Sequence, residues 1–331
     1  MTTVSVNSRP EGFVSGSSSP TPWARLRRIA QYRRILWLLV TRDLKVRYAG
    51  SALGYVWTVL DPLLMSLVYW FVFEKIFHRN AGPDFSPYMI YLVSGQLTWA
   101  WFNGGVTGVV RALRAEAQMV RSSNVPRELW VLRVIASKGI EYLFGLPVLI
   151  IYSAAYVVTP SRDIMFLPLS WVLQAVLLVG LGLILAPATV LFNDLERIVP
   201  IVLRVLFYAS PVLYSLSSVP AKLRSLYTFN PCVGFLTLTH AAFFPASLHQ
   251  PVHKYRVNAD GSYLLQPTLD AQGHQVYNKT TGQPSMHRVS YVDHYISHWN
   301  WVINSSIASV VLLIIGYFLF VRMERAMLKE I

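Results

Sequence analysis

Histidine is the residue type in this chain best suited to metal or proton chemistry, and most of its eight histidines lie between residues 218 and 298. Two pairs are spaced four residues apart, His249 with His253 and His294 with His298. On a helix this spacing would place two imidazoles on one face, but a metal site usually needs a third ligand. The spacing therefore favours polar surface histidines, and we predict no metal site.

The short motifs that hold phosphates or carry out hydrolysis are absent from the sequence. It contains no G-x-x-x-x-G-K-[ST], H-E-x-x-H, C-x-x-C or G-x-S-x-G pattern. The first of these is the loop whose backbone amides hold the phosphates of ATP. We therefore predict that the chain has no catalytic residues and binds no cofactor of its own. Its one cysteine, Cys232, excludes an intrachain disulfide.

A charged segment, RSSNVPRELW at residues 121–130, lies between two long apolar stretches rich in aromatic residues. It contains arginines, a glutamate and a proline, which are typical of a turn at a surface. Two interpretations follow from this composition. The segment is either a solvated loop or a contact that another protein binds.

The composition indicates a membrane protein. Of the 331 residues, 54% are hydrophobic and only 14% are charged, whereas soluble domains carry about 25% charged residues. The mean hydropathy is +0.42. A net charge of +13 would suggest a nucleic-acid partner in a soluble protein. In a membrane protein it reflects Lys and Arg on the cytoplasmic side, so we expect membrane lipids, and no nucleic acid, as partners.

Six apolar stretches approach the roughly 20 residues needed to cross a bilayer. They cover residues 53–77, 88–110, 140–158, 167–192, 198–216 and 299–321. Lys and Arg cluster before the first stretch, between the second and third, and after the sixth. Because the basic side is cytoplasmic, both termini and the loop at residues 111–128 are predicted inside, with residues 218–298 outside. The spans form one transmembrane domain over residues 49–331.

Ahead of the first span, residues 21–48 alternate apolar and basic residues at helical spacing. Trp23, Leu36 and Leu39 belong to the apolar face, and arginines fill the other. This pattern predicts an amphipathic helix in the cytoplasmic interface of the membrane, or alternatively a soluble helix packed on a partner. Residues 1–20 are rich in Ser, Gly and Pro and are predicted to be a disordered tail.

Asp61 and Pro62 interrupt the first apolar stretch. An ionisable residue inside a span is a functional candidate. Asp is also a good helix N-cap and Pro a good first helical residue. We favour the cap, with the helix broken or kinked at Leu60.

The segment outside the membrane divides into two parts. Residues 219–244 hold apolar pieces of about ten residues separated by Pro231, too short to cross, which predicts two short re-entrant or interfacial helices. Beyond residue 247, the turn signals NADG and AQGH separate short alternating runs and predict one or two β-hairpins. The fold class is therefore an all-α polytopic membrane protein with a small β insertion.

Aromatic residues make up 13% of the chain. Many lie at span ends, as an interfacial belt does. A conduit for sugar chains would also need aromatic faces, on which the C–H surfaces of sugars stack, although core packing explains the same residues. The deeper aromatic side chains, which form a candidate glycan path, are Tyr55, Trp57, Tyr69, Tyr142 and Tyr208.

Several motifs, in a fixed order, resemble the permeases of ABC exporters that move polysaccharides such as O-antigen, teichoic acid and mycobacterial galactan. They are Arg47-Tyr48, Leu53-Gly54, Tyr55-Val56-Trp57, Asp61-Pro62-Leu63-Leu64, Val72-Phe73, the segment NVPRELWVL, Asp194-Leu195, Ser210-Pro211-Val212 and Asn230-Pro231. The chain departs from the family pattern at Val125, where the family has Phe, and at Asn193, where it has Arg. The resemblance covers residues 23–244 and resumes at the last span, so the family pattern gives no expectation for residues 247–298.

The resemblance implies a function and partners. It implies a homodimer of this chain that exports an undecaprenyl-linked polysaccharide across a bacterial inner membrane. Two separate P-loop ATPase subunits would bind ATP and Mg²⁺. A galactan exporter of an actinobacterium is the subtype it suggests. The alternatives are a membrane-embedded enzyme acting on lipid-linked sugars, which would need an ionisable cluster, and a secondary transporter, which would more often show inverted repeats.

The resemblance also gives the charged segment a role. In such permeases the loop between the second and third spans forms a short coupling helix that docks on the ATPase. Residues 113–122 can make about two and a half helical turns, and Pro126 is placed to end the loop and open the next helix. The candidate coupling residues are Met119, Val120, Arg121, Asn124, Pro126, Arg127 and Glu128. Arg127 and Glu128 lie at a corner where they can contact either the ATPase or the interface helix.

Overall fold

The structure is a computed structural model of the chain. It describes residues 22–76, 88–155, 162–216, 219–243, 249–255, 265–267, 275, 286–288, 290–297 and 299–330. The predicted disordered tail and the two predicted turns, NADG and AQGH, lie outside the described residues.

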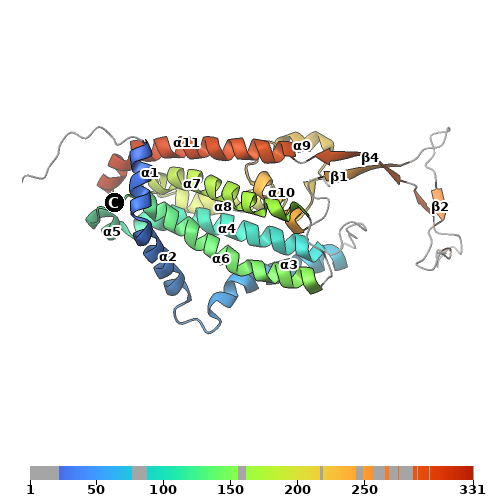
Figure 1. Ribbon diagram of the computed structural model, residues 1–331, viewed down its shortest axis with the longest axis horizontal. Coiled ribbons are helices and arrows are strands. Elements are labelled where there is room, and N and C mark those ends of the chain that lie inside the picture. Colours follow the sequence, from blue (N-terminus) through green and yellow to red (C-terminus); the bar gives the residue numbers. More distant parts are fainter. Residues whose placement is uncertain are drawn as a thin grey trace, which may run out of the picture.

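Long helices running side by side form the body of the molecule (Figure 1). They are α4 (Tyr88–Ala115), α6 (Glu128–Ala155), α7 (Leu167–Leu191) and α11 (Trp299–Glu330). Within the described residues, three stretches are long and apolar enough to cross a membrane: Glu128–Ile151, Arg162–Leu191 and Trp299–Glu324. They coincide with the third, fourth and sixth predicted spans. The count of six spans remains a prediction.

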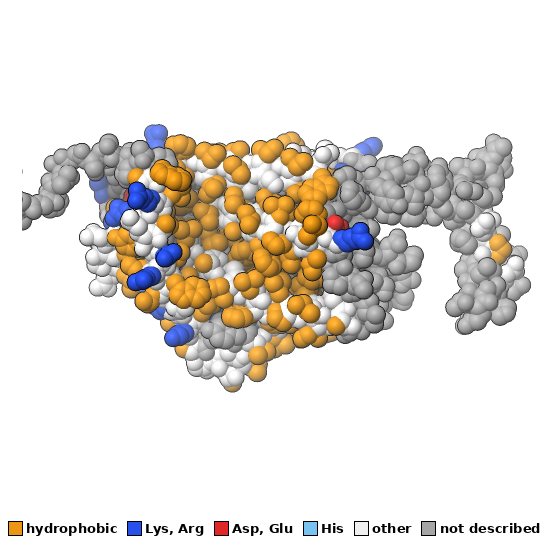
Figure 2. Space-filling model, in the orientation of Figure 1, with side chains coloured by type: hydrophobic (Ala, Val, Ile, Leu, Met, Phe, Trp, Pro, Cys, Tyr) orange, Lys and Arg blue, Asp and Glu red, His pale blue; other side chains and the backbone are white. Residues whose placement is uncertain are grey.

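Hydrophobic side chains cover most of one face of the bundle between its two ends (Figure 2). Many are large and exposed, including Ile150, Val172 and Phe318. Exposed apolar surface on this scale marks a face that contacts something other than water. Lys and Arg side chains follow one end of this belt, the end at which α1 lies (Figure 2).

The two helices α7 and α11 are packed unusually closely. A Cβ atom added at Gly316 would lie 2.4 Å from the carbonyl oxygen of Gly180. No side chain fits at that distance, so both glycines are required for the backbones to meet. Small residues at such contacts are typical of helix pairs inside membranes.

The helix of the first predicted span continues through Asp61 and Pro62, so the predicted N-cap at Asp61 is wrong. The 3-10 turn η1 (Gly54–Val56) leads into α3 (Trp57–Trp70), which continues as the π-helix η2 (Phe71–Ile76). The residue at the N-cap position is Val56. Pro62 lies in the second turn of α3, where it removes one backbone donor. Packing of α3 on α4 and α6 holds the helix together, and Asp61 stays exposed.

The fifth predicted span is shorter than expected. Helix α8 (Leu195–Tyr208) ends well before residue 216, and residues 209–216 form turns. Pro211 has no backbone N–H with which to continue the helix. The carbonyl of Ala209 accepts a hydrogen bond from the side chain of Asn230 at 3.1 Å instead.

Two short helices, α9 (Ala221–Tyr227) and α10 (Cys232–Phe243), follow as predicted for this segment. The Asn230 side chain accepts a hydrogen bond from the backbone N–H of Cys232 at 2.9 Å and so caps α10. Every residue of α10 is buried, because the helix packs against α4, α7 and α11. Its re-entry into a membrane remains a prediction.

The strands beyond α10 pair in a nested order. Strand β1 (His249–Tyr255) is antiparallel to β4 (Ser290–Ser297), and β2 (Leu265–Pro267) is antiparallel to β3 (Met286–Arg288). A local hairpin at NADG would pair β1 with β2, which does not occur among the described strands, and the one or two β-hairpins remain a prediction. The pairs extend away from one end of the helical bundle (Figure 1).

The predicted interface helix is divided in two at Tyr32, into α1 (Pro22–Gln31) and α2 (Arg33–Tyr48). Trp23 is exposed, as a membrane-facing residue should be. Leu39 is only 8% exposed and Leu36 is half-buried, because this face of α2 packs against α6. The assignment of Leu39 to the membrane face is therefore wrong, and that of Leu36 remains a prediction. The large exposed side chains of α2 include Trp37 and Leu38.

Candidate functional site

The predicted coupling segment forms a short helix at one end of the bundle, near α1 (Figure 1). Helix α4 ends at Ala115, and α5 (Ala117–Ser122) begins one residue later. Glu116 between them has φ −118° and ψ 26°, outside the helical region. The continuous helix predicted over residues 113–122 is thus bent at Glu116, which turns α5 away from the bundle.

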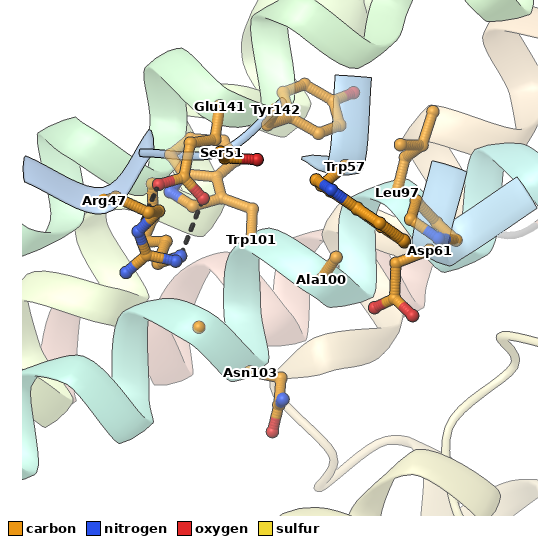
Figure 3. A pocket seen from close by; sticks show the side chains of 13 residues that line it. Arg47, Ser51, Trp57, Asp61, Leu97, Ala100, Trp101, Asn103, Glu141 and Tyr142 are labelled. Atoms are coloured by element: carbon orange, nitrogen blue, oxygen red, sulfur yellow. Dashed lines mark hydrogen bonds and ion pairs between the residues drawn. The ribbon is translucent and has the colours of Figure 1, made fainter. Parts of the chain in front are cut away.

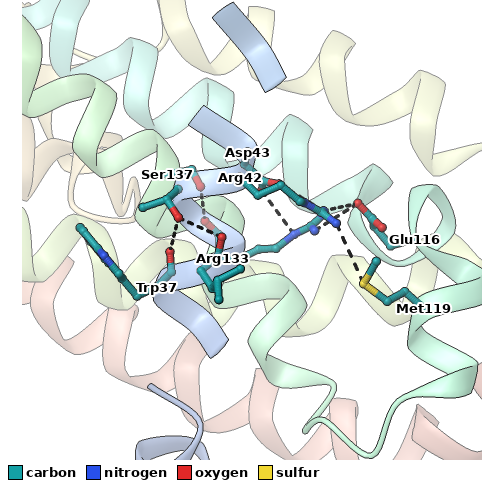
Figure 4. Close-up of polar contacts among 9 residues, drawn as sticks. Trp37, Arg42, Asp43, Glu116, Met119, Arg133 and Ser137 are labelled. Carbon is teal, nitrogen blue, oxygen red and sulfur yellow. Dashed lines mark hydrogen bonds and ion pairs between the residues drawn. The ribbon is translucent and has the colours of Figure 1, made fainter. Parts of the chain in front are cut away.

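Glu116 is the centre of a network of charges that we call the Glu116 network, made of Arg42, Asp43, Glu116 and Arg133 (Figure 4). The Glu116 carboxylate lies 2.5 Å from the Arg42 guanidinium and 3.2 Å from that of Arg133. Asp43 lies 3.4 Å from both arginines. Since these residues come from α2, the α4–α5 bend and α6, the network fixes three elements to one another.

The two arginines of the network are held by further contacts. The Arg133 guanidinium carbon lies 4.9 Å from the centre of the Trp130 ring, within range of a cation–π interaction. Arg42 also approaches the sulfur of Met119 on α5, at 4.0 Å (Figure 4). The Arg133 side chain is 6% exposed, compared with 32% for Arg42. The network therefore has a buried side on α6 and an open side on α2.

A second ion-paired cluster joins α1 to the ends of two long helices. Arg25 on α1 lies 3.0 Å from Glu128 of α6 and 2.9 Å from Glu324 of α11. The pKa of Arg25 is raised, because burial lowers it but the hydrogen bonds and charges of Glu324 and Glu128 together raise it more. Arg28 donates a hydrogen bond to the backbone carbonyl of Asn124 at 3.1 Å. The interface helix is thus clamped to the coupling segment at two points.

The predicted coupling residues fall into two groups. Met119, Arg121 and Asn124 are exposed and available to a partner, and Arg127 is half-buried. The others, Val120, Pro126 and Glu128, are buried.

The burial of the second group corrects part of the prediction. Val120 is 1% exposed and belongs to the chain's own hydrophobic core, so it cannot be a docking anchor. Glu128 binds Arg25 of the interface helix, which is one of its two predicted contacts. Pro126 lies where predicted, since its carbonyl accepts a hydrogen bond at 3.0 Å from the backbone N–H of Leu129 in the first turn of α6.

A pocket of about 570 Å³ lies where the end of α2 meets α3, α4 and α6 (Figure 3). Its charged groups are Arg47, Asp61, Lys138 and Glu141. Glu141 is bound by Arg47 at 3.1 Å and by Lys138 at 2.6 Å. In the pocket, the carboxylate of Glu141 thus binds two cations, Arg47 and Lys138. The carboxylate of Asp61 is exposed.

Aromatic side chains supply the rest of this pocket. Trp57, Trp101 and Tyr142 line it, and the rings of Trp101 and Tyr142 are stacked with centres 5.4 Å apart. Trp57 is about half exposed, at 49%. The exposed ring of Trp57, beside paired charges and the amide of Asn103, suits the C–H faces and hydroxyls of a sugar.

The predicted glycan-path residues are only partly brought together. Trp57 and Tyr142 share the pocket. Tyr69 and Tyr208 lie elsewhere, near each other around Phe207, with ring centres 6.2 Å and 5.1 Å from that of Phe207. Tyr55 lies in η1, and its side chain is outside the described part of the chain.

Comparison with known proteins extends these observations. The family profile of the ABC-2 type transporter matches residues 34–244. The chain is 31% identical over 216 residues to the O-antigen export system permease protein RfbA of Klebsiella pneumoniae, covering 65% of this chain and 82% of the relative. The chain is 34% identical over 221 residues to the protein of the same name from Myxococcus xanthus, covering 66% of this chain and 84% of the relative. It is 26% identical over 215 residues to the polysialic acid transport protein KpsM of Escherichia coli, covering 65% of this chain and 83% of the relative.

The chain belongs to the ABC-2 transporter family. The family match and the three long apolar helices among the described residues make it a multi-pass membrane protein. The matched segment of this ABC-2 chain contains the whole Glu116 network and the whole pocket. Helix α1, the strands and α11 lie outside it.

Sequence reasoning missed the centre of the site in this ABC-2 transporter. Glu116 lies within the predicted cytoplasmic loop but was not singled out, and its partners are 74 and 17 residues away. An acidic residue among many basic ones was the available signal, because a buried or half-buried charge needs a partner. Among the described residues, no group of three His, Cys, Asp or Glu side chains could hold a metal ion.

Proposed function

We propose that this chain is the membrane subunit of an ATP-driven exporter that moves a lipid-linked, O-antigen-like or galactan-like polysaccharide out of the cytoplasm. The observation that carries the proposal is the similarity to O-antigen export permeases, which extends over more than four fifths of each relative. The carrier lipid would be undecaprenyl, as the sequence resemblance implies.

The work would come from another protein. Since the sequence holds no phosphate-binding loop, ATP and Mg²⁺ would bind two separate P-loop ATPase subunits. Two copies of this chain would form the conduit between them. Because ATP is hydrolysed in the ATPase subunits, their conformational change has to be transmitted to the conduit through a contact at the cytoplasmic end.

Helix α5 is the proposed contact, and the Glu116 network supports this assignment. Met119, Arg121 and Asn124 present one apolar and two polar side chains to a partner. A displacement of α5 would act directly on Glu116 and so on Arg42 of α2 and Arg133 of α6. Both helices also line the pocket with Trp57 and Tyr142, so movement at the contact would reach the proposed sugar site.

The proposed orientation follows from the charge distribution. The arginine-rich end with α1 and α5 would be cytoplasmic together with both termini. The α9–α10 segment and the strands would be outside. A multi-pass chain oriented this way in a bacterial inner membrane would take up its substrate at the cytoplasmic face.

Cysteine labelling tests the orientation. Ser122→Cys on α5 and Lys222→Cys on α9 place one thiol at each end, both on exposed residues. In intact cells an impermeant maleimide should label the second and not the first, and both after lysis. The native Cys232 is buried and should stay unlabelled. Labelling of Ser122→Cys in intact cells would reverse the proposed topology.

Vesicle reconstitution tests the function itself. Vesicles containing this chain and its cognate ATPase should move a lipid-linked polysaccharide across the bilayer only with hydrolysable ATP. Vesicles with the chain alone are the control and should be inactive. Transfer by the chain alone, or ATP hydrolysis by it, would contradict the proposal.

A further inference from the structure

A second pocket lies beneath the interface helix, away from the pocket with Trp57 and Tyr142. It has a volume of about 380 Å³ and is bounded by α1, α6, α7 and α11. We call it the α1 pocket. Its lining residues are Arg25, Leu26, Ile29, Glu128, Leu132, Val179, Leu183, Leu313, Ile314, Tyr317 and Phe318.

The α1 pocket is apolar inside and charged at one edge. All its lining residues except Arg25 and Glu128 are hydrophobic. Ile314 and Phe318 on α11 are 51% and 63% exposed, so the pocket is open on the belt side. Apolar surface of this kind gains by contact with hydrocarbon rather than water. In a membrane, the available hydrocarbon is the acyl chain of a lipid.

The charged edge has an unused hydrogen-bond donor. The guanidinium of Arg25 binds Glu128 and Glu324 through its two terminal nitrogens. Within the described residues its Nε is buried and has no hydrogen-bond partner. A buried donor without a partner is costly, and an ester or phosphate oxygen at the mouth of the pocket would supply the acceptor.

The surface above the pocket is strongly basic. Exposed arginines lie on α1 and in the first turn of α2: Arg27, Arg28, Arg33 and Arg34. No acidic residue occurs between residues 22 and 42. Basic clusters on an amphipathic helix at a cytoplasmic face attract anionic lipid headgroups.

We infer that the α1 pocket binds an anionic glycerophospholipid. One acyl chain fills the space between α1 and the three long helices, an oxygen near the glycerol accepts from Arg25 Nε, and the phosphate lies among the arginines of α1. The lipid is a structural ligand that packs α1 against α6 and α11, distinct from the exported substrate.

Native mass spectrometry of the full chain from lipid nanodiscs tests this site, with phosphatidylglycerol and phosphatidylcholine as probes. Phosphatidylglycerol should be retained and phosphatidylcholine should not. Ile314→Trp fills the pocket and should reduce retention by about tenfold or more, since the apolar contact is lost. Its control is Ile307→Trp, the same change at an equally exposed position of α11 outside the pocket.

The headgroup contact has its own pair of variants. Arg27→Gln should weaken phosphatidylglycerol retention about fivefold, the effect of removing one cation near an anionic surface. Arg162→Gln removes an exposed arginine of the 3-10 turn η4 (Arg162–Phe166), which packs against α10 rather than α1, and should change nothing.

The outcomes separate the possible occupants. Equal retention of both lipids, or equal loss with Ile314→Trp and Ile307→Trp, would overturn the inference. If Ile314→Trp instead released the ATPase or the second copy while lipid stayed bound, the pocket would be a protein contact. Because the readout is bound lipid, failure of polysaccharide export in the vesicle assay would leave this result unaffected.

Discussion

The two ends of the helical bundle are held together by different forces. At the end with α5, contacts between elements include ion pairs that reach from buried groups such as Arg133 to partly exposed ones such as Arg42 with Glu116. At the end with α10, they are neutral hydrogen bonds between buried groups. There His240 lies 3.2 Å from the Ser94 hydroxyl and 3.1 Å from the Pro211 carbonyl, with its ring stacked 3.7 Å from that of Tyr91.

This difference indicates which end can move. Removing a buried neutral partner leaves an unsatisfied group and costs about 1–3 kcal/mol. An exposed ion pair contributes about 0–1 kcal/mol and can be exchanged for another. We therefore expect the α10 end to be a fixed frame. The α5 end would transmit displacement, as a subunit driven by a separate ATPase requires.

The largest effect is expected from Gly95→Ala at the α10 end. The new Cβ would lie 2.6 Å from the backbone carbonyl oxygen of Val212, which cannot move away as a side chain could. Stability should fall by about 2–3 kcal/mol because of overpacking, measured by thermal unfolding in detergent. Gly104→Ala is the control, because its Cβ would meet only the flexible end of Lys138, at 3.1 Å. If the two variants were equally stable, the α10 end would not be the tightly packed, fixed part of the molecule.

A smaller loss is expected from His240→Ala. The change deletes the contacts of the buried imidazole with Ser94 and Pro211 and leaves a cavity. We expect about 2 kcal/mol lower stability in the same unfolding assay. ATPase binding per folded molecule should be normal, because α5 is at the other end. A loss of ATPase binding without a loss of stability would contradict the division between the two ends.

The smallest effect on stability is expected from Glu116→Gln. The amide keeps the shape of Glu116 but removes the charge that holds Arg42 and Arg133. Stability should change by less than about 1 kcal/mol, because Asp43 still pairs with both arginines. ATP-driven export should fall by about 2- to 30-fold, the range of coupling energies. Glu196→Gln is the matched control, since Glu196 pairs only with Arg114, at 3.3 Å, among the ion pairs of the described residues. Equal export by both variants would show that the Glu116 network does not couple ATP hydrolysis to export.

Sequence reasoning found the parts of the fold that depend on long apolar runs and strong helix breakers. Helices α7 and α11 followed from hydropathy, and the start of α6 followed from Pro126. The turns after α8 were predicted to belong to the fifth span, because the residues of these buried turns are as apolar as those of a helix. Hydropathy measures transfer from water and does not distinguish contact with lipid from contact with protein.

The same ambiguity explains the errors at the site. Leu39 and Val120 are apolar residues on short helices, and the sequence did not reveal that each faces the chain's own core. The Glu116 network joins residues of three elements far apart in the sequence, so no local spacing could indicate it. The pocket likewise needed the fold to bring Trp101 and Asp61 beside the predicted Trp57 and Tyr142.

If α5 is the contact through which the ATPase drives export, the ATPase should co-purify with this chain only when the exposed surface of α5 is intact. Met119 is the exposed apolar residue of α5, at 40%. Met119→Glu should lower retention of the ATPase about 30-fold, the effect of losing a 2 kcal/mol interface anchor, with normal expression and stability. Met165→Glu alters an exposed methionine of η4 (Arg162–Phe166) at the other end and should retain the ATPase fully. Full retention of the ATPase by Met119→Glu, with export intact, would show that α5 is not the docking contact.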